Sequence, residues 1–490
     1  MGRGVTWPGA ATPVPPATSP TPGRLASRLV CAGCGAEVPA HRPFVVRCPA
    51  ATPGDDIDHV LARRLAHAAL ERRPEADGDP NPYVRYRARF HAYHVAMAAG
   101  WDDARFVSLV RALDEAVAEV DGHGFRTTPL ARSASLDAGL GFHDGAGVWV
   151  KDETGNVSGS HKARHLMGVM LALRVAETLG QADPAAPLAI ASCGNAALAA
   201  AVVARAARRR LLVFVPPSAE APVVERLRSL GAGIEVCERQ PGQAGDPTYL
   251  RLLAAIEAGA VPFTVQGNLD GLAIEGGATL GWELVDQLAA RGSSLDRLVI
   301  QVGGGAFASA QALAFEDALA LGLIDRLPRI DAVQTQGGYP LARAHQRVLD
   351  HLGVDAGVPQ DPARIETGLR EVARHRSAYM WPWETEPVSI AHGILDDETY
   401  DWLAIERAML LTGGRCVVVD EATLQEANAH AGPDLGIDAD HTGTAGLAGL
   451  MSLTREGLVS PDETVAVIFS GVRRTAAAAN HPSGEGDDRP

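Results

Sequence analysis

From residue 147 onward, short apolar runs alternate with longer segments in which apolar residues recur every three or four positions. The short runs predict buried strands, and the helical recurrence predicts amphipathic helices. The predicted strands are Val148–Lys151, Leu188–Ala191, Leu211–Val215, Ile234–Cys237, Phe263–Gln266, Leu298–Val302, Ile330–Thr335, Arg415–Val419 and Val465–Phe469. The predicted helices include Ala163–Leu179, Asn195–Ala207, Val223–Leu230, Tyr249–Ala258, Thr279–Leu288 and Phe307–Leu321. This order predicts an α/β fold with two doubly wound, mostly parallel open sheets that meet near residue 297.

The chain before residue 122 has a different pattern. Amphipathic helices are predicted over Val60–Glu71 and over Tyr83–Val120, separated by a stretch rich in Pro, Asp and Gly. The Pro-rich start and the polar end are predicted to be disordered tails. The predicted organisation is a tail over 1–27, an N-terminal extension over 28–121, two lobes over 122–297 and 298–479, and a tail over 480–490.

Composition excludes several classes of protein. The formal net charge of −15 argues against nucleic-acid binding, which requires a basic surface. No apolar run approaches the roughly 20 residues that span a bilayer, so no membrane association is expected. Six cysteines in 490 residues are too few for a disulfide framework, which favours a reducing, cytoplasmic setting.

The distribution of lysine is unusual. Of the 44 Lys and Arg residues only two are lysine, Lys151 and Lys162. Lysine can lose its proton when desolvated and form a Schiff base, which arginine cannot do. Lys162 opens a predicted helix, where the helix dipole disfavours an ammonium but tolerates an imine or a neutral amine. The alternative is a solvated lysine beside a helix cap, or a chance pairing of two lysines.

Three further segments follow predicted strands, where open α/β sheets bind ligands. Ser192-Cys193-Gly194-Asn195 offers backbone N–H groups for a carboxylate, although it is also an ordinary turn into a helix. Gly303-Gly304-Gly305-Ala306 lets the backbone wrap one phosphomonoester, or forms a plain glycine turn. Ser470 places a hydroxyl at the end of the last strand, with or without a role. Together with a Schiff-base lysine, these features describe a pyridoxal phosphate site.

Over roughly Gly124 to Val472 the chain resembles the fold-type II pyridoxal phosphate enzymes, the tryptophan synthase β-subunit-like family. The resemblance rests on Thr128-Pro129-Leu130, on Ser160-His161-Lys162-Ala163-Arg164 and on the three segments above, all in the family's order. It implies that pyridoxal 5'-phosphate lies between the two lobes, bound to Lys162. It further implies that Gly303 to Ala306 hold the phosphate, that Ser192 to Asn195 hold the substrate carboxylate, that Asn195 faces the ring oxygen, and that Ser470 meets the ring nitrogen.

A serine at the ring nitrogen gives a weaker electron sink than a carboxylate, which suits elimination or replacement beyond the α-carbon of a small amino acid. The expected sequence is exchange at Lys162, removal of the α-proton by its freed amine and loss of a side-chain group. Three features resemble threonine synthase, which converts O-phosphohomoserine to threonine: the N-terminal cysteines, the long segment before the core, and Glu275 to Glu283. Arginines such as Arg164 would then meet the substrate phosphate. The resemblance also implies a homodimer.

Two other functions remain open. The first is an ammonia-lyase of the serine/threonine dehydratase type, in which Glu283 would help bind a cation; otherwise Glu283 is a helix-surface carboxylate. The second is a regulatory protein that senses pyridoxal phosphate without turnover. Retention of Lys162, Ser192, Asn195 and Ser470 argues against the second.

The N-terminal cysteines form one Cys-x-x-Cys knuckle, Cys31 and Cys34, followed by Cys48. Structural zinc requires four ligands, and His59 is the candidate for the fourth. The alternatives are a zinc ribbon and an eroded ribbon that binds no metal.

Overall fold

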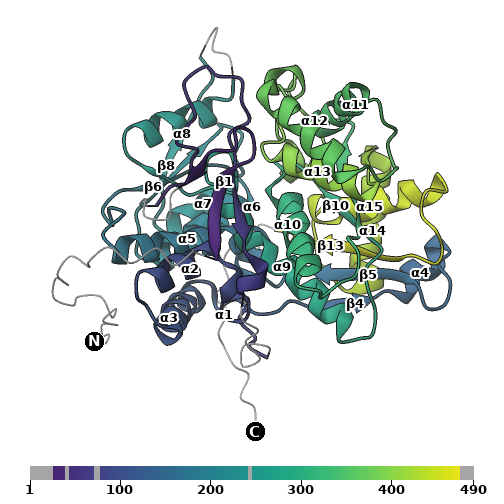
Figure 1. Cartoon of the computed structure of the whole chain (residues 1–490), viewed down its shortest axis with the longest axis horizontal. Helices are drawn as coiled ribbons and strands as arrows, with labels where there is room; N and C mark the ends of the chain where they lie inside the picture. The colour runs from purple at the N-terminus through teal and green to yellow at the C-terminus, as the bar shows by residue number, and fades with distance from the viewer. Residues whose placement is uncertain (1–25, 39–43, 71–77, 241–244, 475–490) are drawn as a thin grey trace.

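The computed structural model describes residues 26–38, 44–70, 78–240 and 245–474. The predicted tails therefore lie almost wholly outside the described residues, apart from Ala26 and Ser27, and Ser27 already belongs to a strand. Two α/β lobes lie side by side, and an N-terminal module, drawn in purple, lies against them (Figure 1). No helix in the described part of the chain is long and apolar enough to cross a membrane.

The smaller lobe contains a four-stranded parallel sheet with the order β8-β7-β6-β9. Its strands are β6 (Leu188–Ala191), β7 (Leu211–Val215), β8 (Gly233–Val236) and β9 (Val261–Pro262). The helices that follow these strands or pack on them are α5 (Lys162–Thr178), α6 (Asn195–Ala206), α7 (Ala221–Ser229) and α8 (Pro247–Glu257). The side chains of β6 alternate between the two faces of the sheet, and helices cover both: Leu188 and Ile190 pack with α5 and α6, and Ala189 packs with α8.

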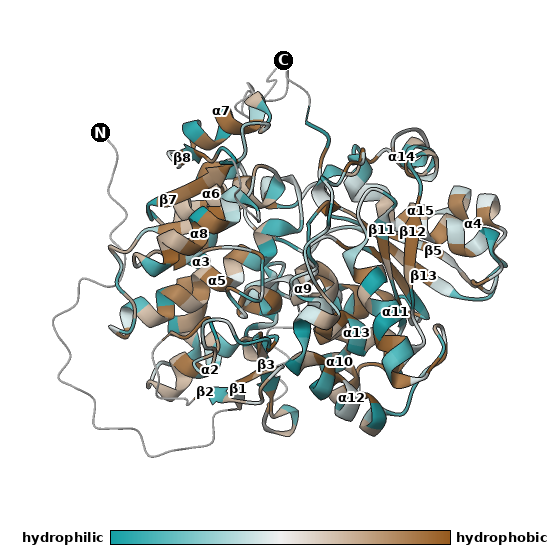
Figure 2. Ribbon diagram, turned by 90° about the horizontal axis from the view of Figure 1, so that it is seen from above, coloured by the Kyte–Doolittle hydropathy of each residue, from teal (hydrophilic) through white to brown (hydrophobic). Residues whose placement is uncertain are grey.

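The larger lobe contains a six-stranded sheet with the order β12-β11-β10-β13-β5-β4, parallel except for β4. Its strands are β4 (Leu130–Arg132), β5 (Gly147–Asp152), β10 (Arg297–Gln301), β11 (Arg329–Thr335), β12 (Cys416–Val419) and β13 (Thr464–Phe469). Its helices are α4 (Ala134–Leu140), α9 (Ala273–Ala289), α10 (Ala306–Ala320), α11 (Pro340–Leu352), α12 (Pro362–Arg374), α13 (Trp402–Thr412), α14 (Glu421–Leu435) and α15 (His441–Arg455). Buried strands in this fold are apolar along their length, as the brown ribbon of β7 in the smaller lobe shows (Figure 2).

The predicted α/β architecture with two mostly parallel sheets is confirmed. The sheets do not, however, divide the chain at one position near residue 297. Strand β5 pairs with β13 from Gly147 to Asp152, so a strand from the first half of the chain completes the second sheet. The chain thus leaves the larger lobe through the loop after β5, builds the smaller lobe and returns through α9 to β10. This crossing places the segment before Lys162 at the junction of the two lobes.

The N-terminal module departs most from the prediction. Residues predicted as a helix over Val60–Glu71 form β3 (Leu61–Leu65) and a short 3₁₀ turn (His67–Ala69), and Glu71 lies outside the described residues. Strand β3 pairs antiparallel with β1 (Ser27–Cys31), which also pairs with β2 (Glu37–Val38). Alternation rather than helical spacing governs β3, because Leu61 and Arg63 are buried on one side.

The second predicted helix, Tyr83–Val120, is broken into separate helices. These are α1 (Pro82–Arg85), α2 (His91–Ala98) and α3 (Asp103–Asp121). Asp102 begins α3 by accepting a hydrogen bond from the N–H of Arg105, which is the role of an N-cap residue. Strand Phe263–Gln266 was also misplaced, because the pairing with β6 covers only Val261 and Pro262.

Candidate active site

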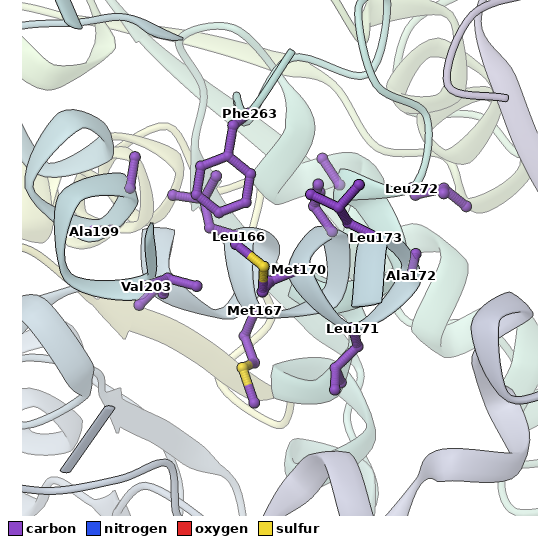
Figure 3. Close-up of a cluster of buried hydrophobic side chains, with 14 of the residues drawn as sticks. Leu166, Met167, Met170, Leu171, Ala172, Leu173, Ala199, Val203, Phe263 and Leu272 are labelled. Carbon is purple, nitrogen blue, oxygen red and sulfur yellow. The ribbon is translucent and has the colours of Figure 1, made fainter. Parts of the chain in front are cut away.

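Lys162 is the first residue of α5, ten positions beyond the end of β5. Helix α5 is held rigidly, because Leu166, Met167 and Met170 pack against α6 and Phe263 (Figure 3). Lys162 itself is partly buried and makes no hydrogen bond or ion pair with any described residue. Desolvation lowers the pKa of Lys162, while the charges of Asp396 and Asp401 act in the opposite direction. The result is an amine that is more readily deprotonated than a surface lysine.

Asp396 and Asp401 lie in the segment between β11 and α13, and no sequence motif pointed to them. Burial raises the pKa of Asp396 to about 6, and the charge of Lys162 and the Gly304 N–H act to lower it. Burial also raises the pKa of Asp401 to about 7, although its carboxylate accepts a hydrogen bond from the Gly267 N–H at 3.0 Å. Each carboxyl is therefore partly protonated near neutral pH and can donate a proton in this site.

The glycine loop Gly303–Gly305 connects β10 to the start of α10. A Cβ atom on Gly303 would lie 2.4 Å from a carboxylate oxygen of Asp396, and one on Gly305 would lie 2.8 Å from Thr399. Gly305 also has a φ of +96°, which favours glycine. Two hydrogen bonds fix the loop carbonyls: the Thr399 hydroxyl donates to the Gly303 carbonyl and the Asp401 N–H donates to the Gly304 carbonyl, both at 3.0 Å. The three glycines carry no side chains and lie at a helix N-terminus, a setting that fits a phosphate group, with the Asp396 carboxyl lying against the same loop.

Ser470, which follows the last residue of β13, is hydrogen-bonded to His161, the residue before Lys162. Its hydroxyl lies 3.0 Å from the His161 N–H and 2.6 Å from the His161 Nδ1. Desolvation keeps the pKa of His161 well below its usual value, so the ring is neutral. Its Nε2 is buried without a partner, and an unpaired acceptor costs less than an unpaired N–H, which favours the proton on Nδ1. Ser470 then accepts two hydrogen bonds and keeps its own hydrogen to donate, as a ring nitrogen requires.

The Ser192–Asn195 turn lies between β6 and α6, with Asn195 as the first residue of the helix. Ser192 and Cys193 are partly buried, and the Gly194 N–H lies 3.4 Å from the Ser192 hydroxyl. A Cβ on Gly471 would lie 3.1 Å from the side-chain nitrogen of Asn195, so this turn is adjacent to Ser470. Arg474 donates to the Asn195 side-chain oxygen at 3.1 Å. The predicted cofactor and substrate residues are thus gathered around the start of α5.

The other lysine has a different environment. Lys151 is fully buried and donates to Glu283 at 2.7 Å, to the Thr128 carbonyl at 2.8 Å and to the Gln287 side-chain oxygen at 2.9 Å. Its three N–H groups are therefore all used, as an ammonium requires. The only two lysines in the sequence therefore differ in environment: the Lys151 ammonium is fully hydrogen-bonded and the Lys162 amine has no hydrogen-bond partner among the described residues.

Two predictions are corrected by this network. Arg164 is fully buried and donates to Glu153 and Glu283 at 2.7–3.1 Å, so it is not available to meet a substrate phosphate. Glu283 is neither a surface carboxylate nor free for a cation, because Arg164 and Lys151 occupy both its oxygens. Despite full burial, these two cations lower the pKa of Glu283 and keep it ionised. Glu283 lies more than a hundred residues from both cations in sequence, which local patterns do not show.

A second cluster lies in the N-terminal module. One ligand atom each from Cys31, Cys34, Cys48 and His59 lies within 4.8 Å of the other three. The Sγ atoms of Cys34 and Cys48 are 3.6 Å apart, close to the roughly 3.8 Å that tetrahedral zinc with Zn–S bonds of about 2.3 Å requires. The Nδ1 of His59 is 3.4 Å from Cys31, and its Nε2 is 3.2 Å from Asp55, which orients the ring. The donor set fits a closed, four-ligand metal site.

Comparison with known proteins agrees with this geometry. A family model described as "Pyridoxal-phosphate dependent enzyme" matches residues 123–471, which include every residue gathered around Lys162 except Arg474. The chain belongs to the family of pyridoxal-phosphate dependent enzymes. Membership implies pyridoxal phosphate as the cofactor, and the glycine loop, the desolvated lysine and the hydroxyl of Ser470 fit that group.

Individual relatives are distant. The chain is 23% identical over 345 residues to a threonine synthase of Methanocaldococcus jannaschii, covering 70% of this chain and 74% of the relative. It is 28% identical over 188 residues to an L-serine dehydratase of Saccharomyces cerevisiae, covering 37% and 53%. Among solved structures, diaminopropionate ammonia lyase from Escherichia coli matches with a TM-score of 0.55 and 17% identity, covering 76% of this chain and 90% of that one. At this identity the structural match shows the fold alone.

Proposed function

We propose that this chain is a pyridoxal phosphate-dependent lyase that removes the α-proton of a small amino acid and then eliminates or replaces a side-chain group. Pyridoxal phosphate, when bound, supplies an electron sink that weakens the bonds at the α-carbon. Lys162 is proposed to hold it, and its released amine is proposed to act as the general base. The observation that carries the proposal is the environment of Lys162, desolvated and unpaired beside the glycine loop.

The other residues serve to bind and orient. Gly303, Gly304, Gly305 and Ala306 are proposed to hold the phosphate, and Ser470 to donate to the ring nitrogen. The Ser192-Cys193-Gly194-Asn195 turn is proposed to hold the substrate carboxylate through backbone N–H groups, with Asn195 also facing the cofactor. A serine rather than a carboxylate at the ring nitrogen favours chemistry on the side chain over transamination.

A threonine synthase-like reaction, from O-phosphohomoserine to threonine, is the first specific candidate. Its support is the extent of the likeness to a threonine synthase, which covers 70% of the chain. With Arg164 sequestered, the cation nearest to the substrate turn in the described residues is Arg474, bound to Asn195 and to the Ser158 carbonyl. Arg474 is therefore the residue expected to meet a substrate phosphate.

A serine/threonine dehydratase-like reaction is the second candidate, and Asp396 and Asp401 favour it. A hydroxyl leaves as water only if it receives a proton, whereas a phosphate leaves as a stable anion. Two carboxyls with pKa values of about 6 and about 7 near Lys162 can supply that proton at neutral pH. Carboxylates near Lys162 would also repel a substrate phosphate.

The visible absorption band of the bound cofactor separates these functions. O-phosphohomoserine, threonine, serine and O-activated serines are added one at a time to the purified protein supplied with cofactor. A change with O-phosphohomoserine alone supports the synthase, and a change with serine or threonine supports the dehydratase. A band that no amino acid alters would indicate a cofactor-sensing protein, and no band at all would refute the proposal.

Zinc is proposed at Cys31, Cys34, Cys48 and His59, as a structural ion with four protein ligands. The module lies against the larger lobe, since Asp58 pairs with Arg376 at 3.2 Å and Arg63 with Asp317 at 2.6 Å. Metal analysis is expected to find about one zinc per chain, lost in Cys34→Ser and kept in Cys237→Ser, whose cysteine lies outside the cluster. Wild-type protein without zinc would exclude the site. The predicted homodimer remains a prediction.

A further inference from the structure

A second pocket lies away from Lys162, between α3, the end of α6 and α7. Its volume is about 740 Å³, and none of the residues gathered around Lys162 lines it. Helix α6 carries Asn195 at its first residue and lines this pocket with its last two residues, so the two sites are separated by about 16 Å at 1.5 Å per residue. The pocket's charged lining residues are Glu115, Glu119, Arg205, Arg208, Arg209 and Arg226.

Of the four arginine side chains, three have no partner or only one long contact with the described residues. Arg209 is occupied, because it pairs with Glu177 and donates to the Ala186 carbonyl. Arg205 reaches only the Leu230 carbonyl at 3.4 Å, and Arg226 lies 3.9 Å from Asp121. Arg208 is exposed, and its side chain makes no hydrogen bond, ion pair or ring contact with the described residues. In a chain with a net charge of −15, three such guanidinium groups around one cavity form a local anion site.

The backbone of Arg208 is strained. Its φ is +54°, and among the described residues only Ser158 and Arg208 have a positive φ without being glycine. Arg208 follows the C-cap of α6, where the Arg209 N–H donates to the Ala204 carbonyl at 2.8 Å. Glycine is the usual residue at such a position, and this chain uses it after the C-caps of α7, α8 and α10. An arginine held in a conformation that glycine adopts freely indicates that its side chain has a use.

The opposite wall of the pocket is acidic. Glu115 and Glu119 are four residues apart on α3, so they share one face of that helix. Both line the pocket, and neither lies within ion-pair distance of an arginine in the described structure. A simple anion would bind the arginines but would be repelled by this wall. A ligand with an ammonium group and anionic groups satisfies both walls, because carboxylates accept the paired N–H groups of arginine and an ammonium donates to glutamate.

We propose that this pocket is a binding site for a free α-amino acid with an acidic side chain, separate from the site at Lys162. Arg205, Arg208 and Arg226 contribute three positive charges and the glutamates two negative charges. A ligand with two anionic groups and one ammonium group balances them. The pocket thus selects acidic amino acids over neutral ones, whichever reaction occurs at Lys162.

Calorimetric titration of the cofactor-loaded protein with L-glutamate tests this proposal, with the visible band recorded in parallel to report on the Lys162 site. A binding event that leaves the visible band unchanged is expected, and L-alanine should not reproduce it. Arg208→Gly should weaken it at least about tenfold, since it removes one guanidinium. Arg228→Ala, which removes an exposed arginine of α7 outside the pocket, should change it less than about twofold.

The same variant also reports on strain. Because glycine adopts a positive φ freely, Arg208→Gly should raise the melting temperature in the absence of ligand even as it weakens binding. No binding to the wild type, equal binding to Arg208→Gly, or binding seen only as a change in the visible band would overturn the proposal. A melting temperature of Arg208→Gly at or below that of the wild type would also count against it. The proposal and the function at Lys162 fail independently, because they are read by different signals.

Discussion

The two lysines of this chain flank one loop, yet their surroundings are opposite. Lys151, the penultimate residue of β5, donates to three acceptors, and with Arg164 it neutralises the buried Glu283. Lys162 begins α5 with no hydrogen-bond or ion-pair partner among the described residues, although the charges of the buried Asp396 and Asp401 act on its pKa. Both are removed from bulk water. Only Lys151 replaces its lost hydrogen bonds to water with hydrogen bonds to protein groups.

This difference in hydrogen bonding gives the two amines different properties. A buried charge with all its hydrogen bonds satisfied stays charged and is costly to disturb. A desolvated amine without partners loses its proton more readily, which makes it a nucleophile and a base. Burial alone therefore does not distinguish the two lysines, whereas their hydrogen-bond partners do.

The largest expected effect is the loss of turnover in Lys162→Ala. Activity should fall by at least about 10³-fold, because the variant loses both the cofactor's attachment point and the general base. The melting temperature of the cofactor-free variant should stay near or above that of the wild type, because an unpaired desolvated amine does not stabilise the fold. Lys162→Arg is the matched control and should be equally inactive, since a guanidinium does not lose its proton. Full activity in either variant would contradict the assignment of Lys162.

Lys151→Met should have the complementary effect on stability. Removing the ammonium leaves Glu283 with one buried cation and the Gln287 side-chain oxygen without the donor it has in Lys151, which should cost about 3–5 kcal/mol in the free energy of unfolding. Denaturant unfolding of the cofactor-free protein measures this loss. Arg455→Ala breaks the exposed pair with Glu426 and should cost less than about 1 kcal/mol. A change of similar size in the two variants would show that the buried network is not the stabilising element.

The sequence predicted well those parts of the fold that depend on continuous apolar runs. Strands β6 and β7 have the predicted bounds, because buried parallel strands are apolar at every position. It failed at β3, where Leu61-Ala-Arg-Arg-Leu65 has helical composition but pairs with β1, thirty residues away. Propensity is local, whereas the partner of an antiparallel strand is not.

The same limit applies to the site. Lys162, the glycine loop and the Ser192–Asn195 turn belong to local segments whose residue types already indicate their chemistry. The pairing of His161 with Ser470 spans 309 positions, and the approach of Asp396 to the glycine loop has no motif at all. The partners of Arg164 were missed for the same reason, and a substrate role was predicted for it instead. Burial and pairing of titratable groups are tertiary properties.

The smallest expected effect, and the sharpest test of the environment of Lys162, is a shift in pH dependence in Asp396→Asn. The Asp396 carboxylate raises the pKa of Lys162, so its removal should lower that pKa. Cofactor attachment requires the neutral amine, so the midpoint of its rate should move to lower pH, by less than about one unit because no ion pair is broken. Near and below the pKa of Asp396, about 6, the wild-type carboxyl is itself protonated and the two proteins should converge.

The growth of the visible band after cofactor is added to cofactor-free protein, followed from about pH 5 to about pH 9, measures this midpoint. The maximal rate is a poorer readout, since Asp396 also lies against the glycine loop and its loss should aid phosphate binding. Asp397→Asn is the matched control, because Asp397 acts on the pKa of Asp396 but not directly on that of Lys162. A midpoint that is unchanged or higher in Asp396→Asn would mean that the pKa of Lys162 is governed by desolvation alone, and the contrast with Lys151 would then rest on hydrogen-bond partners without any contribution from the charge of Asp396.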